Sequence, residues 1–380
     1  MIYNVTQKST RQVFPTSIVQ QTAFWSEVKR EQGVLSAAFN FYANPRLFPK
    51  EGARCSKTAK SAYLRGDMLV LLQQLDRDYC MAYVPYGPES EPLEEYRGPF
   101  LESLSESLRA FLPKGCIAIR YDLSWSSPWV DDESCFDPMG HWMGPPSQQM
   151  QEFRFNYNTK HHNLWKANTD ILPSHTLFLN LRKDKSELLG AMKPKTRYNI
   201  QLSQRKGVTV QAKGIHHLDA WYRLYAETAR RNHFYLHDID YFRSVLTAKA
   251  DHTTSPADVQ LLVAEHRGQP LAAMFMVITG KRGTYLYGAS SSENRNCMAT
   301  YALQWTALER AREAGCTEYD MFGIAPRPEP SHPLYGLYRF KSGFGGSVYH
   351  TMGCWDYPLL PSLYAGFQSS EMVAQGYHLS

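Results

Sequence analysis

The segment 319–346 (YDMFGIAPRPEPSHPLYGLYRFKSGFGG) holds the residues of this chain that are most suited to chemistry. It begins with Tyr319-Asp320 at the end of an expected strand, and open sheets commonly present ligand-binding residues at such ends. Lys341 follows Phe340 and precedes a glycine-rich run, so its ammonium group would lie in an apolar wall beside adaptable backbone. The alternative is a loop packed by aromatic rings, from which Lys341 extends its charged end into water. Composition does not separate the two interpretations.

A second candidate is the basic segment 193–206 (KPKTRYNIQLSQRK), which has five cations and no acidic residue. Pro194 is typical of a first helical turn and Gly207 of a helix end, so a short helix with a concentrated positive face is expected. Most charge runs are solvated surface. The absence of any balancing acid here favours contact with phosphates.

The next expected helix, near residues 217–231, ends in the sequence TARRNHFY. Its two adjacent arginines can stabilise the negative end of the helix dipole, which is the simpler interpretation. Alternatively, Arg231 and Tyr235 could bind a diphosphate, because the planar guanidinium matches phosphate oxygens.

Other kinds of catalytic site are disfavoured. The serines lack the Gly-x-Ser-x-Gly elbow, and the adjacent His pairs at 161–162 and 216–217 have side chains that diverge, which makes a metal role improbable. The loop 288–300 (GASSSENRNCMAT) has no glycine after Gly288, although a coenzyme A pyrophosphate needs small residues before the helix. A catalyst without nucleophile or metal must work by positioning and charge stabilisation.

Composition sets the frame for these candidates. The chain has 380 residues, enough for two domains, with 43% hydrophobic and 20% charged residues. Its longest apolar stretch, residues 271–278, is far shorter than the ~20 residues that span a bilayer. Seven cysteines without a CxxC pair argue against a disulfide framework, and no secretory signal is evident. We expect a reduced, cytoplasmic protein whose net charge of +5 suits an anionic partner.

The elements that must position the candidates occur in the same order twice. In the first half, expected strands at 68–75 and 79–84 precede a helix, Gly115-Cys116 and a strand reaching Tyr121-Asp122. In the second half, strands at 260–265, 271–278 and 283–288 precede a helix, Gly315-Cys316 and a strand reaching Tyr319-Asp320. Strands, crossover helix and strand predict an α/β (α+β) fold. Two copies of an N-acetyltransferase-like unit would fit, although the repeated order could also arise by chance.

Several of these segments together resemble the Fem family (FemA, FemB and FemX relatives) of non-ribosomal aminoacyl transferases. The matching segments lie in order between residues 20 and 357 and read FWSEVKREQGV, YVPYGP, KPKTRYNIQLSQRKGV, TARRNHF and YDMFGI…HPLYGLYRFKSGFGG. The resemblance implies two tandem GNAT-like domains with mixed, strongly twisted sheets. We place domain 1 at residues 1–165, completed by 350–380, and domain 2 at 166–349.

The resemblance also implies roles for individual residues. Lys29 matches a lysine that contacts the phosphates of the nucleotide sugar, and Arg231 with Tyr235 matches the pair that binds the same diphosphate. Asp122 is similar to an aspartate facing the end of the acceptor peptide, and Tyr287 to a tyrosine lining that channel. Phe340-Lys341 matches a pair associated with the aminoacyl-tRNA end.

Basic residues of 193–206, namely Lys195, Arg197 and Arg205, are our own candidates for tRNA contact. The resemblance implies a long coiled-coil arm in FemA-type members, but residues 207–260 show no sustained heptads, so we expect a compact, FemX-like form without the arm. Residues 131–165 match no family segment.

The resulting prediction is a tRNA-dependent aminoacyltransferase of peptidoglycan biosynthesis, with no cofactor beyond aminoacyl-tRNA as co-substrate. It would join an amino acid to a side-chain amine of UDP-N-acetylmuramyl-pentapeptide or its lipid-linked form, as a monomer peripheral to the inner membrane face. Lys341 would stabilise the oxyanion. The alternatives are a coenzyme-A-dependent N-acyltransferase on the same fold and a non-catalytic tRNA- or glycan-binding module.

Overall fold

The computed structural model describes residues 2–49 and 63–378, and the chain forms two compact units. Unit 1 consists of Met1–Phe14, Gly33–Ser174 and His350–Ser380, and unit 2 of Pro15–Gln32 and His175–Tyr349. This division differs from the sequence-based one at two points. Residues 166–174 belong to unit 1, where Lys166 pairs with Trp355 in a sheet. Residues 15–32 belong to unit 2, where the backbone amide of Ala23 donates to the hydroxyl of Ser255.

The sheet of unit 1 has the strand order β1-β2-β3-β4-β5-β13, and β6 also pairs with β13. Strands β1 to β4 are antiparallel neighbours, β4 and β5 are parallel, and β5 and β13 are antiparallel. The strands are β1 (Ile2–Lys8), β2 (Leu35–Ala43), β3 (Leu64–Gln74), β4 (Cys80–Val84), β5 (Cys116–Ser126), β6 (Trp165–Lys166) and β13 (Ser347–Pro358). The helices are α2 (Arg97–Leu108), α3 (Gln148–Phe155) and α10 (Pro361–His378).

The sheet of unit 2 has the order β8-β9-β10-β11-β12-β7, in which β8 to β12 repeat the connectivity of β1 to β5, while β7 precedes the other strands in the chain and β13 follows them. Strands β8 to β11 are antiparallel neighbours, β11 and β12 are parallel, and β12 and β7 are antiparallel. The strands are β7 (His175–Asn180), β8 (Thr209–Lys213), β9 (Asp258–His266), β10 (Gln269–Thr279), β11 (Arg282–Ser290) and β12 (Glu318–Asp320). The helices are α1 (Ala23–Glu31), α4 (Lys185–Ala191), α5 (Pro194–Arg205), α6 (Leu218–Asn232), α7 (Ile239–Thr247), α8 (Ala299–Glu313) and α9 (Tyr335–Lys341).

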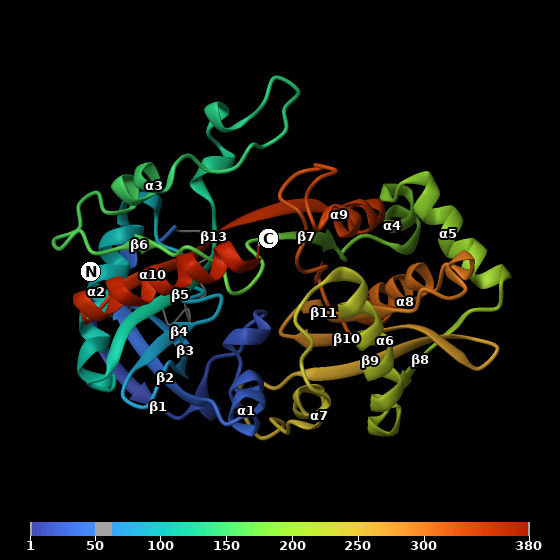
Figure 1. Ribbon diagram of the computed structural model, residues 1–380, viewed down its shortest axis with the longest axis horizontal. Helices are drawn as coiled ribbons and strands as arrows, with labels where there is room; N and C mark the ends of the chain where they lie inside the picture. Colours follow the sequence, from blue (N-terminus) through green and yellow to red (C-terminus); the bar gives the residue numbers. More distant parts are fainter. Residues whose placement is uncertain (1, 50–62, 379–380) are drawn as a thin grey trace. The chain divides into compact units, whose positions relative to one another are not determined.

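The repeated order in the sequence therefore reflects a repeated topology. In each unit a helix, α2 or α8, connects two parallel strands (Figure 1). The tyrosine of each Tyr-Asp pair is fully buried and is bonded to the crossover helix. Tyr121 shares a hydrogen bond with Ser105, and Tyr319 accepts one from Gln304, both at 2.9 Å.

Each sheet is covered on both faces. In unit 1, α2 packs on the face that carries Tyr121 and Trp355, and Tyr364 of α10 packs on the face that carries Ile117 and Met81. In unit 2, α8 packs on β9 and β10 with α5 beside it, and α6 and α7 pack on the other face. Strand β10 is buried on both sides, which explains its continuous apolar sequence.

The strand expected to end at Tyr121-Asp122 continues to Ser126, so Asp122 lies inside β5 and not at its end. Between Gly207 and Gln260 the chain forms β8, α6 and α7, and none of these is a coiled-coil arm. None of the helices in residues 2–49 and 63–378 is long and apolar enough to cross a membrane.

Candidate functional site

Lys341 is the last residue of α9 and is only 4% exposed. Its Nζ donates to the carbonyl oxygens of Phe322 at 3.0 Å and Gly323 at 2.7 Å, and it lies 5.1 Å from the ring centroid of Tyr285. Burial lowers the pKa of Lys341 to about 7, although the carboxylate of Asp320 acts in the opposite direction. Ammonium and amine forms therefore coexist near neutral pH. The interpretation in which Lys341 extends into water is wrong.

The carbonyl groups that hold Lys341 are fixed by the end of β12. Phe322 has φ +59°, a left-handed conformation that is costly for a residue with a side chain. Its backbone N–H donates to the carboxylate of Asp320 at 2.8 Å, and Thr176 also donates to that carboxylate. Burial raises the pKa of Asp320. This support was missed from the sequence, although the repeated Tyr-Asp pair marked the position.

The side chain of Phe340 packs against aromatic rings, whereas that of Lys341 is held by carbonyl oxygens. The half-buried ring of Phe340 packs edge-to-face on Tyr301 at 5.1 Å and on Phe344 at 5.2 Å between centroids. These contacts belong to the hydrophobic core of unit 2. Phe340 thus anchors α9, and it places Lys341 through packing.

The basic helix α5 is attached to the segment that follows Lys341. The backbone N–H of Lys193 donates to the carbonyl oxygen of Gly343 at 2.9 Å. A Cβ at Gly343 would lie only 2.3 Å from the hydroxyl of Thr196, so only glycine allows this close approach. Helix α5 and the lysine segment therefore form one continuous part of unit 2.

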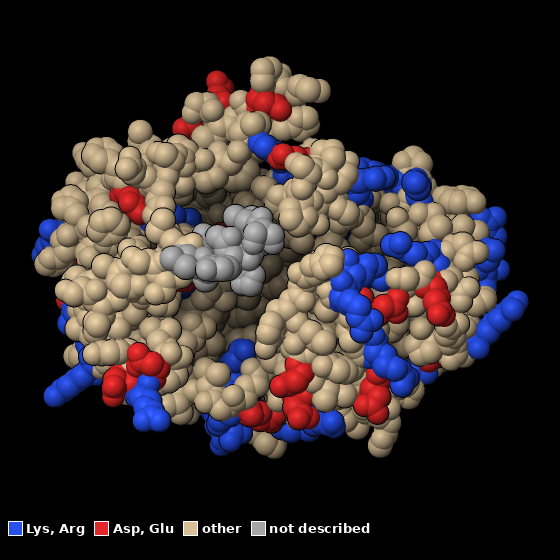
Figure 2. Space-filling view, viewed as in Figure 1, with Lys and Arg blue, Asp and Glu red and all other residues tan. Residues whose placement is uncertain are grey.

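The three candidate cations of α5 are not equivalent. Arg197 donates to the carbonyl oxygens of Leu189, Gly190 and Met192, and so caps the end of α4. Lys195 and Arg205 are exposed. Figure 2 shows Lys and Arg side chains gathered over the region of α5 and of α6 in unit 2.

Arg231, near the end of α6, is bonded to the end of β11. It donates to the carbonyl oxygen of Ser290 at 2.9 Å, to the hydroxyl of Ser292 at 3.0 Å and to the hydroxyl of Ser290 at 3.1 Å. Tyr235 is 78% exposed, and its ring lies 5.1 Å from that of His237. Helix α6 ends before Tyr235 and His237, and its C-cap is His233, which has φ +54°.

Lys29 on α1 lies among aromatic rings. Its Nζ is 5.0 Å from the ring centroid of Trp25 and 5.1 Å from that of Tyr241, and it donates to Gln32. Burial lowers the pKa of Lys29 to about 8. The hydroxyl of Tyr241 shares a hydrogen bond with that of Tyr287 on β11, so Tyr241 connects two of the predicted residues.

His237 completes this group. Its ring is stacked on Tyr241 at 4.2 Å, and burial together with the charge of Lys29 lowers the pKa of the imidazole. Tyr241 and His237 were not identified from the sequence. Their only signal was the density of aromatic residues in 234–242.

Asp122 lies in unit 1 on β5 and is fully buried. It accepts hydrogen bonds at 2.9 Å from the hydroxyl of Tyr83 and from the backbone N–H of Leu172. Burial raises the pKa of Asp122 to about 7, with a further contribution from the nearby Asp170 carboxylate. Leu172 and Asp170 are in a segment that gave no sequence signal.

The chemistry of the site rests on cations and hydroxyl groups. Within the described parts of the chain, no group of three or more His, Cys, Asp and Glu residues is arranged to hold a metal ion. Around β11, unit 2 brings Lys29 and Tyr287 together through Tyr241, and Arg231 is held at the end of the same strand.

The chain is similar to one family model and to several curated and solved proteins. A model of the FemAB family matches residues 12–256 and 249–371. The lipid II:glycine glycyltransferase of Staphylococcus aureus (strain USA300) is 25% identical over an alignment of 256 residues, and the match covers 51% of this chain and 61% of that protein. The match thus spans less than two thirds of the curated relative.

Among solved structures, the crystal structure of FemX is similar with a TM-score of 0.69 and 17% identity, covering 96% of this chain and 100% of that one. A tandem GNAT protein from the clavulanic acid biosynthesis pathway has a TM-score of 0.48 and 11% identity over 93% of this chain and 98% of that one. The likeness to FemX confirms the predicted mixed α/β fold. Since the family match covers most of its length, the chain belongs to the FemAB family.

Proposed function

We propose that this protein transfers an amino acid from aminoacyl-tRNA to a side-chain amine of the pentapeptide of a peptidoglycan precursor. The observation that carries the proposal is the buried Lys341, whose Nζ is held by two carbonyl oxygens and whose pKa is about 7. Membership of the FemAB family and the similarity to lipid II:glycine glycyltransferase support the same reaction class.

The chemistry that Lys341 would assist is aminolysis of an ester. The acceptor amine attacks the ester carbonyl carbon, and a tetrahedral intermediate with a negative oxygen forms. The ammonium of Lys341 has three N–H groups; two donate to Phe322 and Gly323, and the third can donate to that oxygen. The intermediate collapses when the bond to the ribose oxygen breaks. The ribose oxygen takes up a proton, and the nitrogen of the new amide loses a proton that it carried as the attacking amine.

Positive side chains supply binding sites for the two anionic substrates. We assign the diphosphate of the acceptor to Lys29, which contacts the ring of Tyr241, and to Arg231, which is bonded to the last residue of β11. We assign the tRNA backbone to the exposed cations of α5, because this helix is bonded to the Lys341 segment through Gly343. Asp122 is assigned to the end of the acceptor peptide.

The coenzyme A alternative is weakened by the loop before α8. The backbone N–H groups of Cys297 and Met298 donate to the carbonyl oxygens of Asn294 and Arg295 within the loop. A pyrophosphate cradle at a helix N-terminus needs such N–H groups to point at the ligand. In this loop, the N–H groups of Cys297 and Met298 already donate to carbonyl oxygens of the loop itself.

The experiment is a donor and acceptor matrix with the purified protein. Labelled aminoacyl-tRNA or labelled acetyl-coenzyme A is combined with UDP-N-acetylmuramyl-pentapeptide or with its lipid-linked form in detergent. Transfer from aminoacyl-tRNA to either acceptor supports the proposal. Transfer from acetyl-coenzyme A alone would establish the alternative enzyme, and tRNA binding without transfer in any combination would leave a binding module.

A further inference from the structure

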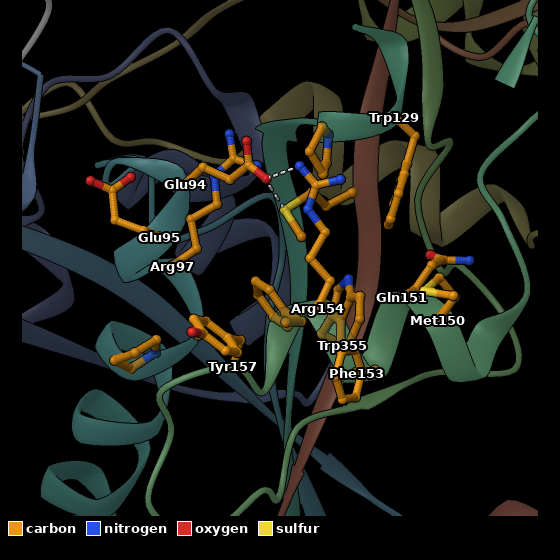
Figure 3. A pocket seen from close by; sticks show the side chains of 15 residues that line it. Glu94, Glu95, Arg97, Trp129, Met150, Gln151, Phe153, Arg154, Tyr157 and Trp355 are labelled. Atoms are coloured by element: carbon orange, nitrogen blue, oxygen red, sulfur yellow. Dashed lines mark hydrogen bonds and ion pairs between the residues drawn. The ribbon is translucent and has the colours of Figure 1, made fainter. Parts of the chain in front are cut away.

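Unit 1 has a pocket of about 580 Å³ in which Glu94, Glu95 and Arg97 lie on one side and Met150 and Gln151 lie on the opposite side (Figure 3). The two acids and two arginines of its lining balance in charge, and most of the other side chains are aromatic rings, prolines and methionines. Such a lining is compatible with many small molecules and selects no single class of ligand. The contacts of Tyr241 in unit 2 are more specific.

The two tyrosines of β11, Tyr285 and Tyr287, point to opposite faces of the sheet although they are two residues apart. In a regular strand such residues share a face. Here Met276 of β10 is opposite Tyr285 and Phe275 is opposite Tyr287, so the pairing shifts by one residue between them. The extra residue makes a β-bulge, a feature that redirects side chains. Tyr287 therefore faces α7, and its ring packs edge-to-face on Phe242 at 5.3 Å between centroids.

On that face Tyr287 contacts Tyr241 of α7. The two hydroxyls share a hydrogen bond, and the ring centroids are 5.9 Å apart. Tyr241 is also fixed at the start of its helix, because its backbone N–H donates at 2.7 Å to the carboxylate of Asp238, the N-cap of α7. The imidazole of His237 stacks on its ring within 14° of parallel. The half-buried Tyr241 is thus held by its own segment as well as by Tyr287.

The ring of Tyr241 also contacts the ammonium group of Lys29 on α1. The Nζ lies 5.1 Å from the ring centroid of Tyr241 and 5.0 Å from that of Trp25, and it donates to Gln32 at 2.9 Å. In the described part of the chain, Lys29 has no ion pair with a carboxylate. Aromatic faces attract a cation without neutralising it. The charge of Lys29 therefore stays available for an anion.

Tyr241 is the residue through which both of these predicted residues are held, one by its ring and one by its hydroxyl. We propose that Tyr241 is a positioning residue for the precursor. Its ring orients the ammonium of Lys29 toward the diphosphate, and its hydroxyl orients Tyr287 along the acceptor channel. This inference rests on the proposed function, which takes Lys29 and Tyr287 as parts of the acceptor site. Tyr241 acts through these two side chains and needs no contact with the precursor itself.

Two variants separate the ring from the hydroxyl. Tyr241→Phe keeps the ring and removes the hydroxyl, whereas Tyr241→Leu removes both. The full-length protein is titrated by calorimetry with UDP, which has the diphosphate but no peptide, and with UDP-N-acetylmuramyl-pentapeptide. Tyr241→Phe should bind UDP like the wild type and the pentapeptide precursor about three- to tenfold more weakly, the effect of one neutral hydrogen bond. Tyr241→Leu should bind UDP about three- to tenfold more weakly, the effect of one cation–π contact.

A double-mutant cycle with Lys29→Met tests whether the ring acts through the ammonium group. In the Lys29→Met background, Tyr241→Leu should have no further effect on UDP affinity. A purely structural role of Tyr241 would lower UDP affinity by the same factor in both backgrounds. The matched control is Tyr222→Leu, which removes a half-buried tyrosine of α6 and should leave UDP affinity unchanged. Thermal midpoints show that each variant is folded.

The outcomes separate this inference from the function on which it rests. Equal effects of Tyr241→Leu in the two backgrounds would overturn the positioning of Lys29. Wild-type affinity of Tyr241→Phe for the pentapeptide precursor would overturn the positioning of Tyr287. Wild-type protein that binds the precursor but not UDP would overturn the inference alone, because Lys29 would then not serve a diphosphate. Wild-type protein that binds neither UDP nor either form of the precursor would overturn the proposed function together with the inference.

Discussion

Arg231 donates to both the carbonyl oxygen and the hydroxyl of Ser290, and so joins the end of α6 to the end of β11. The guanidinium is thereby held in one orientation at the strand end where we place the diphosphate. An arginine whose orientation is fixed in this way loses little conformational entropy when it binds phosphate oxygens.

Replacing Arg231 by alanine should weaken binding of the UDP-linked precursor by about 1.5–3 kcal/mol, the range for hydrogen bonds to charged groups. Affinity for tRNA should barely change. Isothermal titration with each ligand measures both effects. The matched control is Arg230→Ala, an exposed neighbour on the same helix. Equal losses for the two ligands, or equal losses in the two variants, would remove the assignment.

The Lys29→Met variant tests whether the buried ammonium group of Lys29 binds the diphosphate of the precursor. The pKa of Lys29 is about 8 in the fold and 10.5 as the ordinary value. Between these pH values the unfolded chain holds a proton that the folded protein lacks, so stability should rise with pH across this window. Lys29→Met should remove that rise and leave the stability at pH 7 equal or higher, while precursor binding weakens.

The measurement is the thermal midpoint across this pH window, together with precursor titration at pH 7. A variant that keeps the wild-type pH dependence would show that Lys29 is not the titrating group. Unchanged precursor affinity would show that its charge is not used for the diphosphate.

The fold was largely predictable, because the features that specify it are local. Continuous apolar sequence marks β10, Gly207 marks the end of α5, and the repeated Tyr-Asp pairs mark equivalent strands of the two units. The division of the chain into two units was harder to predict from the sequence. It depends on α1 joining the second unit and on residues 166–174 joining the first, and no local pattern encodes such long-range contacts.

Arg231 and Lys341 were singled out by their residue context, whereas Lys29 and Tyr287 were named only because their segments resemble a family pattern. Lys29, Tyr287, Arg231 and Lys341 were named, but the groups that orient them were not. Tyr241 becomes visible only when the chain is folded, because it acts through a hydrogen bond between segments far apart in sequence. Asp320 was noted at its strand end, but its hydrogen bonds with Thr176 and Phe322 were not. Arg197 is the opposite case. It was named as a candidate for tRNA contact, and in the structure its guanidinium caps the end of α4.

The exposed cations of α5 should contribute to tRNA binding through its phosphates. Lys195→Ala combined with Arg205→Ala should lower tRNA affinity and reduce the slope of log K against log salt by about 0.7–0.9 for each phosphate that these side chains neutralise. Filter binding over a salt series measures the slope. The charge-matched control is Arg46→Ala with Lys114→Ala, two exposed cations of unit 1. The same slope in wild type and the α5 variant would make α5 ordinary solvated surface.

Asp122→Asn should change how stability and acceptor binding depend on pH. The pKa of Asp122 is about 7 in the fold and 3.8 as the ordinary value, so between these values the folded protein holds the extra proton. Wild-type stability should fall as pH rises from about 4 to about 7, and the variant should lack this fall. If the carboxylate binds the acceptor amine, KM for the precursor should also lose a step near pH 7. A variant with the wild-type KM profile would exclude Asp122 from acceptor binding.

The central claim is that Lys341 stabilises charge that exists only in the transition state, so its loss should reduce turnover more than binding. Lys341→Met keeps the bulk of the side chain and removes the charge. Lys341→Arg should rescue poorly, because a planar guanidinium places its charge differently from an ammonium held by two carbonyl groups. Thermal midpoints of both variants show whether the fold is kept.

The most direct measurement is the single-turnover rate of transfer at saturating aminoacyl-tRNA and precursor, compared between wild type and Lys341→Met. We predict a rate lower by about 10²–10³-fold, the usual effect of losing one oxyanion partner, with little change in either dissociation constant. A folded Lys341→Met protein that transfers at the wild-type rate once saturated would contradict the account, because Lys341 would then serve binding alone.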